Sequence, residues 1–127
     1  MAEAKWSYIC NTDKRASPTH HQAMLDEHKA AAYGTGYDWT IKQIQKKDIV
    51  FLYENGVGLV AFGYASGDMQ SVPEDVEYSM PLNLFTFLNP PISASKMKEL
   101  TGHDFFFRQT VIPIPESDAQ KLIDSMK

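Results

Sequence analysis

Two apolar runs in the middle of the chain carry the clearest pattern of hydrophobic and polar positions. Residues 48–53 and 57–63 are apolar at nearly every position and rich in β-branched and aromatic side chains. An Asn-Gly pair at 55–56 lies between them and supplies the positive φ angles of a tight hairpin turn. The pattern predicts a hairpin buried on both faces and central to a sheet. Gly58 and Gly63 are expected at a bulge or a close backbone approach.

Three further extended segments are predicted around this hairpin. They are residues 6–10, 77–88 and 105–114, and a polar loop is predicted over residues 65–76. In the first segment the side chains alternate, so Trp6, Tyr8 and Cys10 share one face. The segment 77–88 is bent at Pro81 and is expected to end at the Asn-Pro-Pro sequence that follows it.

Capping residues predict a long helix before the hairpin. Ser17 followed by Pro18 is typical of an N-cap and a first helical position. Gly34 is a stop signal, so the helix is expected to run to about Tyr33. Its apolar stripe is weak, which places it over the edge of the sheet rather than deep in the core.

Three shorter helices are predicted from the same kinds of signal. A Thr-x-x-Gln capping box at 40–43 predicts a helix that ends near Lys47. Ser93 is an N-cap and Gly102 a stop for a helix after the Asn-Pro-Pro sequence. A second capping box, at 117–120, opens a terminal helix whose apolar residues share one stripe.

Strands and helices do not alternate regularly, which disfavours a doubly wound parallel sheet. The expected fold class is α+β: a curved mixed sheet, or a pseudo-barrel of about five or six strands, with flanking helices. The chain has 127 residues, of which 43% are hydrophobic. This length and composition fit a single domain over residues 1–127.

Charge narrows the function classes only slightly. The net charge of -4 argues against a protein that coats nucleic acid by bulk attraction. The excess lies in the second half: residues 65–127 hold nine acidic and five basic side chains, whereas residues 1–64 hold seven of each. The first half can still present a local basic face, although ordinary solvated charges explain the same residues. The basic residues concerned are Lys14, Arg15, Lys42, Lys46 and Lys47.

The apolar runs and the single cysteine bear on location. No run is long enough to cross a bilayer and the N-terminus has no apolar leader segment, so a cytoplasmic protein without a membrane contact is expected. Cys10 is alone and flanked by apolar strand residues. It is therefore predicted to be an inert buried thiol in a reducing compartment.

No reaction centre stands out among the polar residues. His21 and His28 share a helix face but lie two turns apart, too far for ordinary chelation, so no metal site is predicted. The sequence has neither a Gly-x-Ser-x-Gly elbow nor a phosphate-binding glycine loop before a helix. The acidic residues at 74–77 are expected to be solvated. We therefore expect no cofactor and favour binding over catalysis.

Aromatic residues are the more informative set. Five of them lie in predicted strands and are expected in the core: Trp6, Phe51, Phe62, Phe85 and Phe87. Tyr37 and Trp39 differ, because they lie in a glycine-rich stretch where no strand or helix period requires a buried ring. Two interpretations stay open: the two rings form a stacking wall for a flat base, or they anchor the loop.

The order of these motifs resembles the EVE and YTH branch of the PUA-like domains over roughly residues 5–126. Trp39, the strand 47–53, the glycine hairpin at 56–58 and the strand 60–63 look like the centre of that family. The sequence Arg108-Gln109-Thr110, with the strand and helix after it, looks like its closing part. The resemblance implies a five- or six-stranded pseudo-barrel whose groove takes a base flipped out of a DNA or RNA strand.

The resemblance also implies the residues of the site. In such domains an aromatic cage grips the modified base, and polar groups at the end of the first strand contact it. Trp39 matches the family's tryptophan, and Asn11 and Thr12 match the polar positions, while residues 10–13 replace the family's Lys-Ser-Glu-Pro-like run. The expected base pocket is Trp39, Tyr37, Asn11, Thr12 and Gln109. The expected phosphate contacts are Lys14, Arg15, Lys42 and Lys46, and Arg108 either joins them or pairs with an internal carboxylate.

Three functions follow from these observations. The leading hypothesis is a non-catalytic module that binds a modified or unpaired base in DNA or RNA. A second is a small enzyme acting on nucleotides or nucleic acid, with Asp13, His20 or His21 near the same groove. A third is an accessory domain with a protein partner, suggested by the acidic second half and the polar stretch 66–74.

Overall fold

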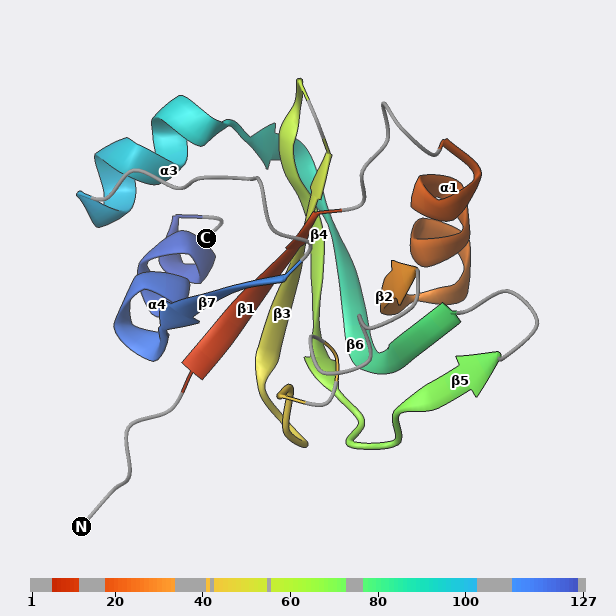
Figure 1. Ribbon diagram of the computed structural model, residues 1–127. Helices are drawn as coiled ribbons and strands as arrows, with labels where there is room; N and C mark the ends of the chain where they lie inside the picture. Colours follow the sequence, from red (N-terminus) through yellow and green to blue (C-terminus); the bar gives the residue numbers. More distant parts are fainter. Residues whose placement is uncertain are drawn as a thin grey trace, which may run out of the picture.

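A seven-stranded mixed sheet forms the centre of the computed structural model, which describes residues 6–11, 18–33, 41, 43–54, 56–72, 77–102 and 111–125 (Figure 1). The strands are β1 (Trp6–Asn11), β2 (Lys29–Tyr33), β3 (Ile49–Glu54), β4 (Gly58–Ala65), β5 (Gln70–Val72), β6 (Glu77–Ile92) and β7 (Val111–Pro115). The helices are α1 (Pro18–Glu27), α3 (Ala94–Thr101) and α4 (Glu116–Asp124). The strand order is β2-β6-β4-β3-β1-β7, with β5 beside β6. β1 and β3 pair in parallel, whereas the other described pairs are antiparallel.

The predicted central hairpin is confirmed. β3 and β4 are antiparallel neighbours, and the Val57 N–H donates to the Glu54 carbonyl at 3.0 Å across the turn. Gly56 has a φ of 81°, the left-handed conformation that the Asn-Gly turn requires. Gly58 permits a close approach of two strands, because a Cβ there would lie 2.1 Å from the Ile92 carbonyl oxygen.

The second half of the predicted long helix is instead a strand. Helix α1 ends at Glu27, and His28 has a φ of 55°, which turns the chain into β2. β2 pairs with β6, and its alanines 30–32 are fully buried. Lys29 forms an ion pair with Glu77, 3.1 Å from Nζ to Oε2, with both side chains largely buried. Alanine favours helices by propensity, but these small side chains let a strand approach the core closely, and burial overrides propensity.

Strand β6 also runs past its predicted end. It continues through the Asn-Pro-Pro sequence to Ile92, which pairs with Leu59 of β4. The two prolines lie within a register shift of the β4–β6 ladder, where a missing N–H costs little. In the predicted loop 65–76, residues 70–72 form β5, which pairs with the start of β6. β2 and β5 are therefore the strands that the sequence did not predict.

The helix signals near the C-terminus had mixed outcomes. Ser93 caps α3 as predicted, since its hydroxyl accepts a hydrogen bond from the Lys96 N–H, and Gly102 ends the helix with a φ of 78°. The second capping box is wrong. Helix α4 follows Pro115, which makes no side-chain cap, so residues 117–120 lie inside the helix.

The short helix predicted before the hairpin does not reach Lys47. Residues 43–48 form turns, in which the Ile44 N–H donates to the Ile41 carbonyl at 3.0 Å. The Tyr8 hydroxyl donates to the Gln43 carbonyl at 3.1 Å, which fastens this segment to β1.

Two hydrophobic clusters lie on the two faces of the sheet. The inner cluster is Tyr8, Cys10, Met24, Ala30, Ala31, Ala32, Ile41, Ile44, Val50, Leu52, Ala61, Ala65, Met80, Leu82 and Val111. The outer cluster is Ile9, Phe51, Tyr53, Leu59, Phe62, Leu88, Ile92, Met97, Ile114, Ala119 and Leu122. Figure 1 shows α3 and α4 on one side of the central strands and α1 with β2 on the other. The two helices on the outer side contribute Met97, Ala119 and Leu122 to the outer cluster.

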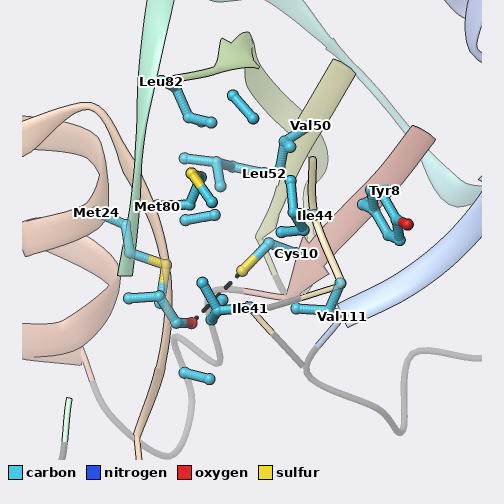
Figure 2. Packing of buried hydrophobic residues seen from close by; sticks show 14 of the residues in the cluster. Tyr8, Cys10, Met24, Ile41, Ile44, Val50, Leu52, Met80, Leu82 and Val111 are labelled. Atoms are coloured by element: carbon cyan, nitrogen blue, oxygen red, sulfur yellow. Dashed lines mark hydrogen bonds between the residues drawn. The ribbon is translucent and has the colours of Figure 1, made fainter. Parts of the chain in front are cut away.

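The sheet curls around the inner cluster. β1 and β2 are separated by three strands in the sheet order, yet the Cys10 thiol of β1 donates to the Ala31 carbonyl oxygen of β2 at 3.6 Å (Figure 2). This contact requires distant strands of one sheet to approach each other. The resulting half-barrel with flanking helices confirms the expected α+β fold class.

Candidate functional site

The contact between β1 and β2 joins the two strands that precede, in the sequence, most of the predicted pocket residues. In the sequence, residue 12 comes two positions after Cys10, and residue 34 comes three positions after Ala31. Ile41, where the chain returns, is fully buried in the same inner cluster. The described residues that flank the stretches 12–17 and 34–40, Asn11 and Tyr33, each lie within two positions of a residue in this contact. We call the contact between β1 and β2 the seam.

Cys10 is structural at the seam. Its side chain is fully buried, as predicted, and burial raises the pKa of the thiol to about 12, an effect that the hydrogen bond to Ala31 only partly offsets. The thiol is therefore protonated at neutral pH, and only a thiolate is an effective nucleophile. Cys10 is not a catalytic residue of the described site.

Tyr8 is the second polar group of the inner cluster. Burial, and then the charge of Asp48, raise the pKa of its hydroxyl. The hydroxyl stays protonated and donates to the Gln43 carbonyl, so it positions the segment that leads into β3.

Asn11 lies at the end of β1 but on the other face from Cys10. It is 8% exposed and is aligned with Tyr53 of β3, which belongs to the outer cluster. Side chains alternate along a strand, so Asn11 shares the face of Ile9. The Asn11 side chain therefore lies on the outer face of the sheet, the side covered by α3 and α4.

Lys46 is far from Asn11. It is exposed in the turn before β3, and its Cβ is 2.8 Å from where a Cβ on Gly67 would lie. Asn11 instead aligns with Tyr53 near the end of β3. The two residues thus lie at opposite ends of this strand, roughly 13 Å or more apart along it. The structure does not bring this phosphate contact and this pocket residue together.

The other predicted site residues lie outside the described part of the chain. They are Thr12, Lys14, Arg15, Tyr37, Trp39, Lys42, Arg108 and Gln109.

A cluster of three rings on β6 and the end of α1 was missed by the sequence analysis. The rings of His28 and Phe85 are stacked, with centroids 4.3 Å apart and planes 5° from parallel. Phe87 is nearly perpendicular to both, 5.1 Å from Phe85 and 6.3 Å from His28. Phe85 and Phe87 were both expected in the core, but Phe87 is 57% exposed and Phe85 only half-buried. The prediction of a core role for Phe87 is wrong.

The pairing of the strands explains where Phe87 lies. Cys10, Leu52, Ala61 and Phe87 are successive cross-strand partners through β1, β3, β4 and β6. Cross-strand partners share a face, so Phe87 lies on the inner face, in one row with Cys10. The first three members of the row are fully buried and the fourth is open. The inner face is therefore closed at the seam and open at β6.

A hollow of about 360 Å³ adjoins the exposed ring of Phe87. Its lining comes from the second half of β6, from α3 and from the residue after α4. The lining residues are Thr86, Phe87, Leu88, Pro90, Pro91, Ile92, Lys96 and Ser125. This volume is at the lower end of the range of small-molecule sites. One aromatic residue and one cationic residue thus line the same concave space, together with two hydroxyl residues whose hydroxyls donate to backbone carbonyls.

Metal-ligand clusters and membrane-spanning helices are both absent from the described residues. Within them, no three His, Cys, Asp or Glu side chains are grouped closely enough to hold a metal ion. His28, one of the four histidines, is used in the ring stack. No helix in the described ranges has the length and apolar character needed to cross a membrane.

Several solved structures share the fold over almost the whole chain. Rpa0253 of Rhodopseudomonas palustris is 15% identical and has a TM-score of 0.64, with 96% of this chain and 92% of that chain covered. A mutant of the ASCH protein of Zymomonas mobilis is 11% identical and has a TM-score of 0.65, with 95% and 99% covered. The chain shares the fold of this ASCH protein. Atu2648 of Agrobacterium tumefaciens shares it, at 11% identity and a TM-score of 0.65, with 95% and 92% covered.

The sequence comparisons add no family. No protein-family description matches the chain, and no curated protein matches it. The likeness to these solved structures therefore concerns the fold alone, since the identities are too low to carry over residue roles.

Proposed function

We propose that the chain is a non-catalytic domain that binds single-stranded DNA or RNA and holds an unpaired or modified base between Tyr37 and Trp39. The observation that carries the proposal is the seam. The contact between Cys10 and Ala31 brings β1 and β2 together, and the stretches 12–17 and 34–40, which carry most of the proposed pocket residues, follow these two strands in the sequence.

The chemistry of these residues supports a base as the ligand. An unpaired base offers two flat faces and a hydrogen-bonding edge, so it needs ring walls and a few polar groups rather than an acid or a base catalyst. Tyr37 and Trp39 supply rings, Thr12 and Gln109 supply polar groups, and the order of motifs resembles the EVE and YTH branch. Asn11, buried at the end of β1, would hold that strand end in position.

The charge distribution supports the same ligand. Lys14, Arg15 and Lys42 lie in or next to the two stretches that follow β1 and β2 in the sequence and would neutralise the phosphates on either side of the held base. Arg108 is the further candidate for such a contact. Lys46, at the other end of β3, would contact only a more distant phosphate.

Fluorescence anisotropy with short labelled oligonucleotides tests the proposal. The panel contains single-stranded DNA and RNA, each with and without a modified base, at several salt concentrations. Trp39→Ala is expected to weaken binding by about 5- to 150-fold, because a stacked base contributes about 1–3 kcal/mol. Tyr64→Leu is the matched control, since Tyr64 is a half-buried ring beside Phe62 on the outer side of the sheet. Equal affinities for Trp39→Ala and the wild type would refute a base-binding slot between Tyr37 and Trp39.

The same samples distinguish the alternatives. If the oligonucleotides are shortened or altered during incubation, the domain is an enzyme and the proposal of a binding module fails. If no oligonucleotide in the panel binds, a protein partner becomes the better hypothesis. Substituting Lys14 or Arg15 by Gln is expected to lower the dependence of log affinity on log salt by about 0.7 for each lost phosphate contact.

A further inference from the structure

We infer that the hollow beside Phe87 is a second nucleotide subsite, in which the Phe87 ring stacks on a base and Lys96 contacts a phosphate of a single strand. This inference rests on the proposed function, because the same strand would continue from the Tyr37 and Trp39 slot. It adds a site made of described residues and sets a minimum length for the ligand.

The position of Phe87 against the ring stack favours stacking. His28 covers one face of the Phe85 ring. If Phe87 lay above the other face of Phe85, its centroid would be much farther from the His28 centroid than the observed 6.3 Å. Phe87 therefore lies beside the His28–Phe85 stack. Perpendicular aromatic contacts of this kind stabilise a fixed ring orientation. The ring still exposes 57% of its surface and lines the hollow. Phe87 is thus an oriented ring that no described residue covers.

The charge of the hollow favours an anionic ligand. Lys96 is the one charged side chain among the lining residues, and it is half exposed. Its partner Glu99 lies on the next turn of α3, with Nζ and Oε1 3.7 Å apart and Glu99 strongly exposed. Such a surface pair contributes little, so a phosphate can compete for the ammonium group. Thr86 and Ser125 also line the hollow, but their hydroxyls already donate to the Leu84 and Leu122 carbonyls at 3.1 and 2.7 Å, so Lys96 is the group that would contact a phosphate.

The hollow and the seam lie at opposite ends of the strand order β6-β4-β3-β1, and α3 contributes Lys96 to the hollow. Phe87 and Cys10 are the ends of one cross-strand row, three strand spacings apart, or roughly 14 Å along the sheet. Cys10, Leu52 and Ala61 in this row are fully buried, so a bound strand would pass around the sheet rather than along this face. At about 3.4 Å per nucleotide it needs more than four nucleotides to reach both positions. A single strand can therefore occupy both subsites, whereas a dinucleotide can occupy only one.

A protein partner fits this surface less well. The large hydrophobic residues that the described surface exposes are Val57, Leu84 and Phe87, and Val57 lies at the tip of the β3–β4 hairpin. A protein-docking face usually presents a larger continuous apolar patch. The combination of one ring with one cation is typical of single-strand binding.

The experiment compares a dinucleotide with an oligonucleotide of eight nucleotides, by anisotropy, for the wild type and three variants. Phe87→Leu keeps an apolar side chain and removes the ring, Phe87→Trp keeps a ring, and Lys96→Gln removes the cation. Leu84→Ala is the matched control, because Leu84 is exposed on the same strand and does not line the hollow. Thermal unfolding of each variant checks that the fold is intact.

The subsite predicts a length-dependent result. Phe87→Leu is expected to weaken binding of the longer oligonucleotide by about 5- to 150-fold and to leave dinucleotide binding unchanged, and Phe87→Trp restores the affinity. Lys96→Gln is expected to lower the salt dependence for the longer oligonucleotide by about 0.7. Leu84→Ala is expected to behave as the wild type.

Other outcomes separate the subsite from the proposed function. If Trp39→Ala abolishes binding while Phe87→Leu and Lys96→Gln have no effect, the subsite is refuted and the slot stands. If Phe87→Leu loses binding while Trp39→Ala does not, the slot is refuted and the hollow is the main site. If the wild type binds neither oligonucleotide, both fail. Loss of self-association in Phe87→Leu, measured by sedimentation without any nucleic acid binding, would assign the hollow to a second copy of the chain.

Discussion

Two ring clusters on neighbouring strands of this sheet have opposite environments. Phe51 and Phe62, with centroids 5.8 Å apart, are buried in the outer cluster beneath α3 and α4. Phe85 and Phe87, at 5.1 Å, are packed almost as closely on the inner face, but Phe87 is mostly exposed. The ring contacts are alike, and the difference lies in the covering elements. A close aromatic contact therefore does not by itself identify a core.

The largest expected effect is a difference in stability between a substitution in the buried ring cluster and one in the exposed ring cluster. Phe51→Ala is expected to lower the free energy of unfolding by about 3–5 kcal/mol, because it leaves a cavity in the buried outer cluster. Phe87→Ala is expected to lower it by about 1 kcal/mol or less, since most of that ring already faces solvent. Urea denaturation with a constant m-value measures both. A loss of several kcal/mol in Phe87→Ala would show that Phe87 is a packing residue and would remove the argument for an open ring.

The sequence was informative wherever local chemistry decides the conformation. The Asn-Gly turn, Gly58 and the Ser93 cap each act through their own backbone or a neighbour within a few residues, and all three were predicted correctly. The apolar runs of β3 and β4 predicted central strands because both faces of these strands are buried. The α+β fold class was predicted from the irregular order of the expected strands and helices along the chain.

The sequence did not predict features that depend on contacts between residues far apart in the chain. The alanines of β2 favour a helix locally and become a strand because β6 and the β1 thiol lie beside them. Phe87 has the pattern of a core strand residue, and its exposure depends on how far the covering elements extend. A signal was present in the second case: the Asn-Pro-Pro sequence after it is typical of an edge rather than a covered sheet.

The candidate site was less predictable than the fold. Asn11 was chosen for its polarity at a strand end, but its face depends on register, and the alignment with Tyr53 puts it on the outer face. Lys46 was grouped with basic residues that are near in sequence, whereas the strand direction separates it from Asn11. Residue type alone cannot supply either position.

A smaller effect, the pH dependence of the free energy of unfolding, tests whether the inner face is closed to solvent at Cys10. Burial raises the pKa of Cys10 to about 12, well above the usual value of a free thiol, so the folded state holds this proton more tightly than the unfolded state. The resulting stabilisation is complete below pH 9 and is lost as the pH rises toward 12. We expect the free energy of unfolding to fall by about 1.4 kcal/mol per pH unit in that window from this group. Burial also raises the pKa of Tyr8, which adds to the loss at the upper end.

The control for the thiol is Cys10→Ala. This variant is less stable at neutral pH because it loses buried volume, but its stability should depend less on pH between 9 and 12 than that of the wild type. Urea denaturation at several alkaline pH values measures the difference. An identical pH dependence in the two proteins would mean that the seam is open to solvent at Cys10. The contrast between a closed seam and an open β6 would then be lost.

The smallest effect concerns the backbone that sets the open rings in place. Leu84 is 79% exposed and has a φ of 52°, a conformation that costs a residue with a Cβ about 1–2 kcal/mol relative to Gly. It lies in a register shift that puts one extra residue on β6 opposite Gly63, immediately before Phe85. Leu84→Gly removes the strain but adds freedom to the unfolded chain, for a net stabilisation of up to about 1 kcal/mol in urea denaturation. Leu84→Ala keeps the strain and is expected to be neutral. If Leu84→Gly is instead less stable than Leu84→Ala, the strained turn is held by the Leu84 side chain, and the orientation of the rings depends on that side chain rather than on the β4–β6 register.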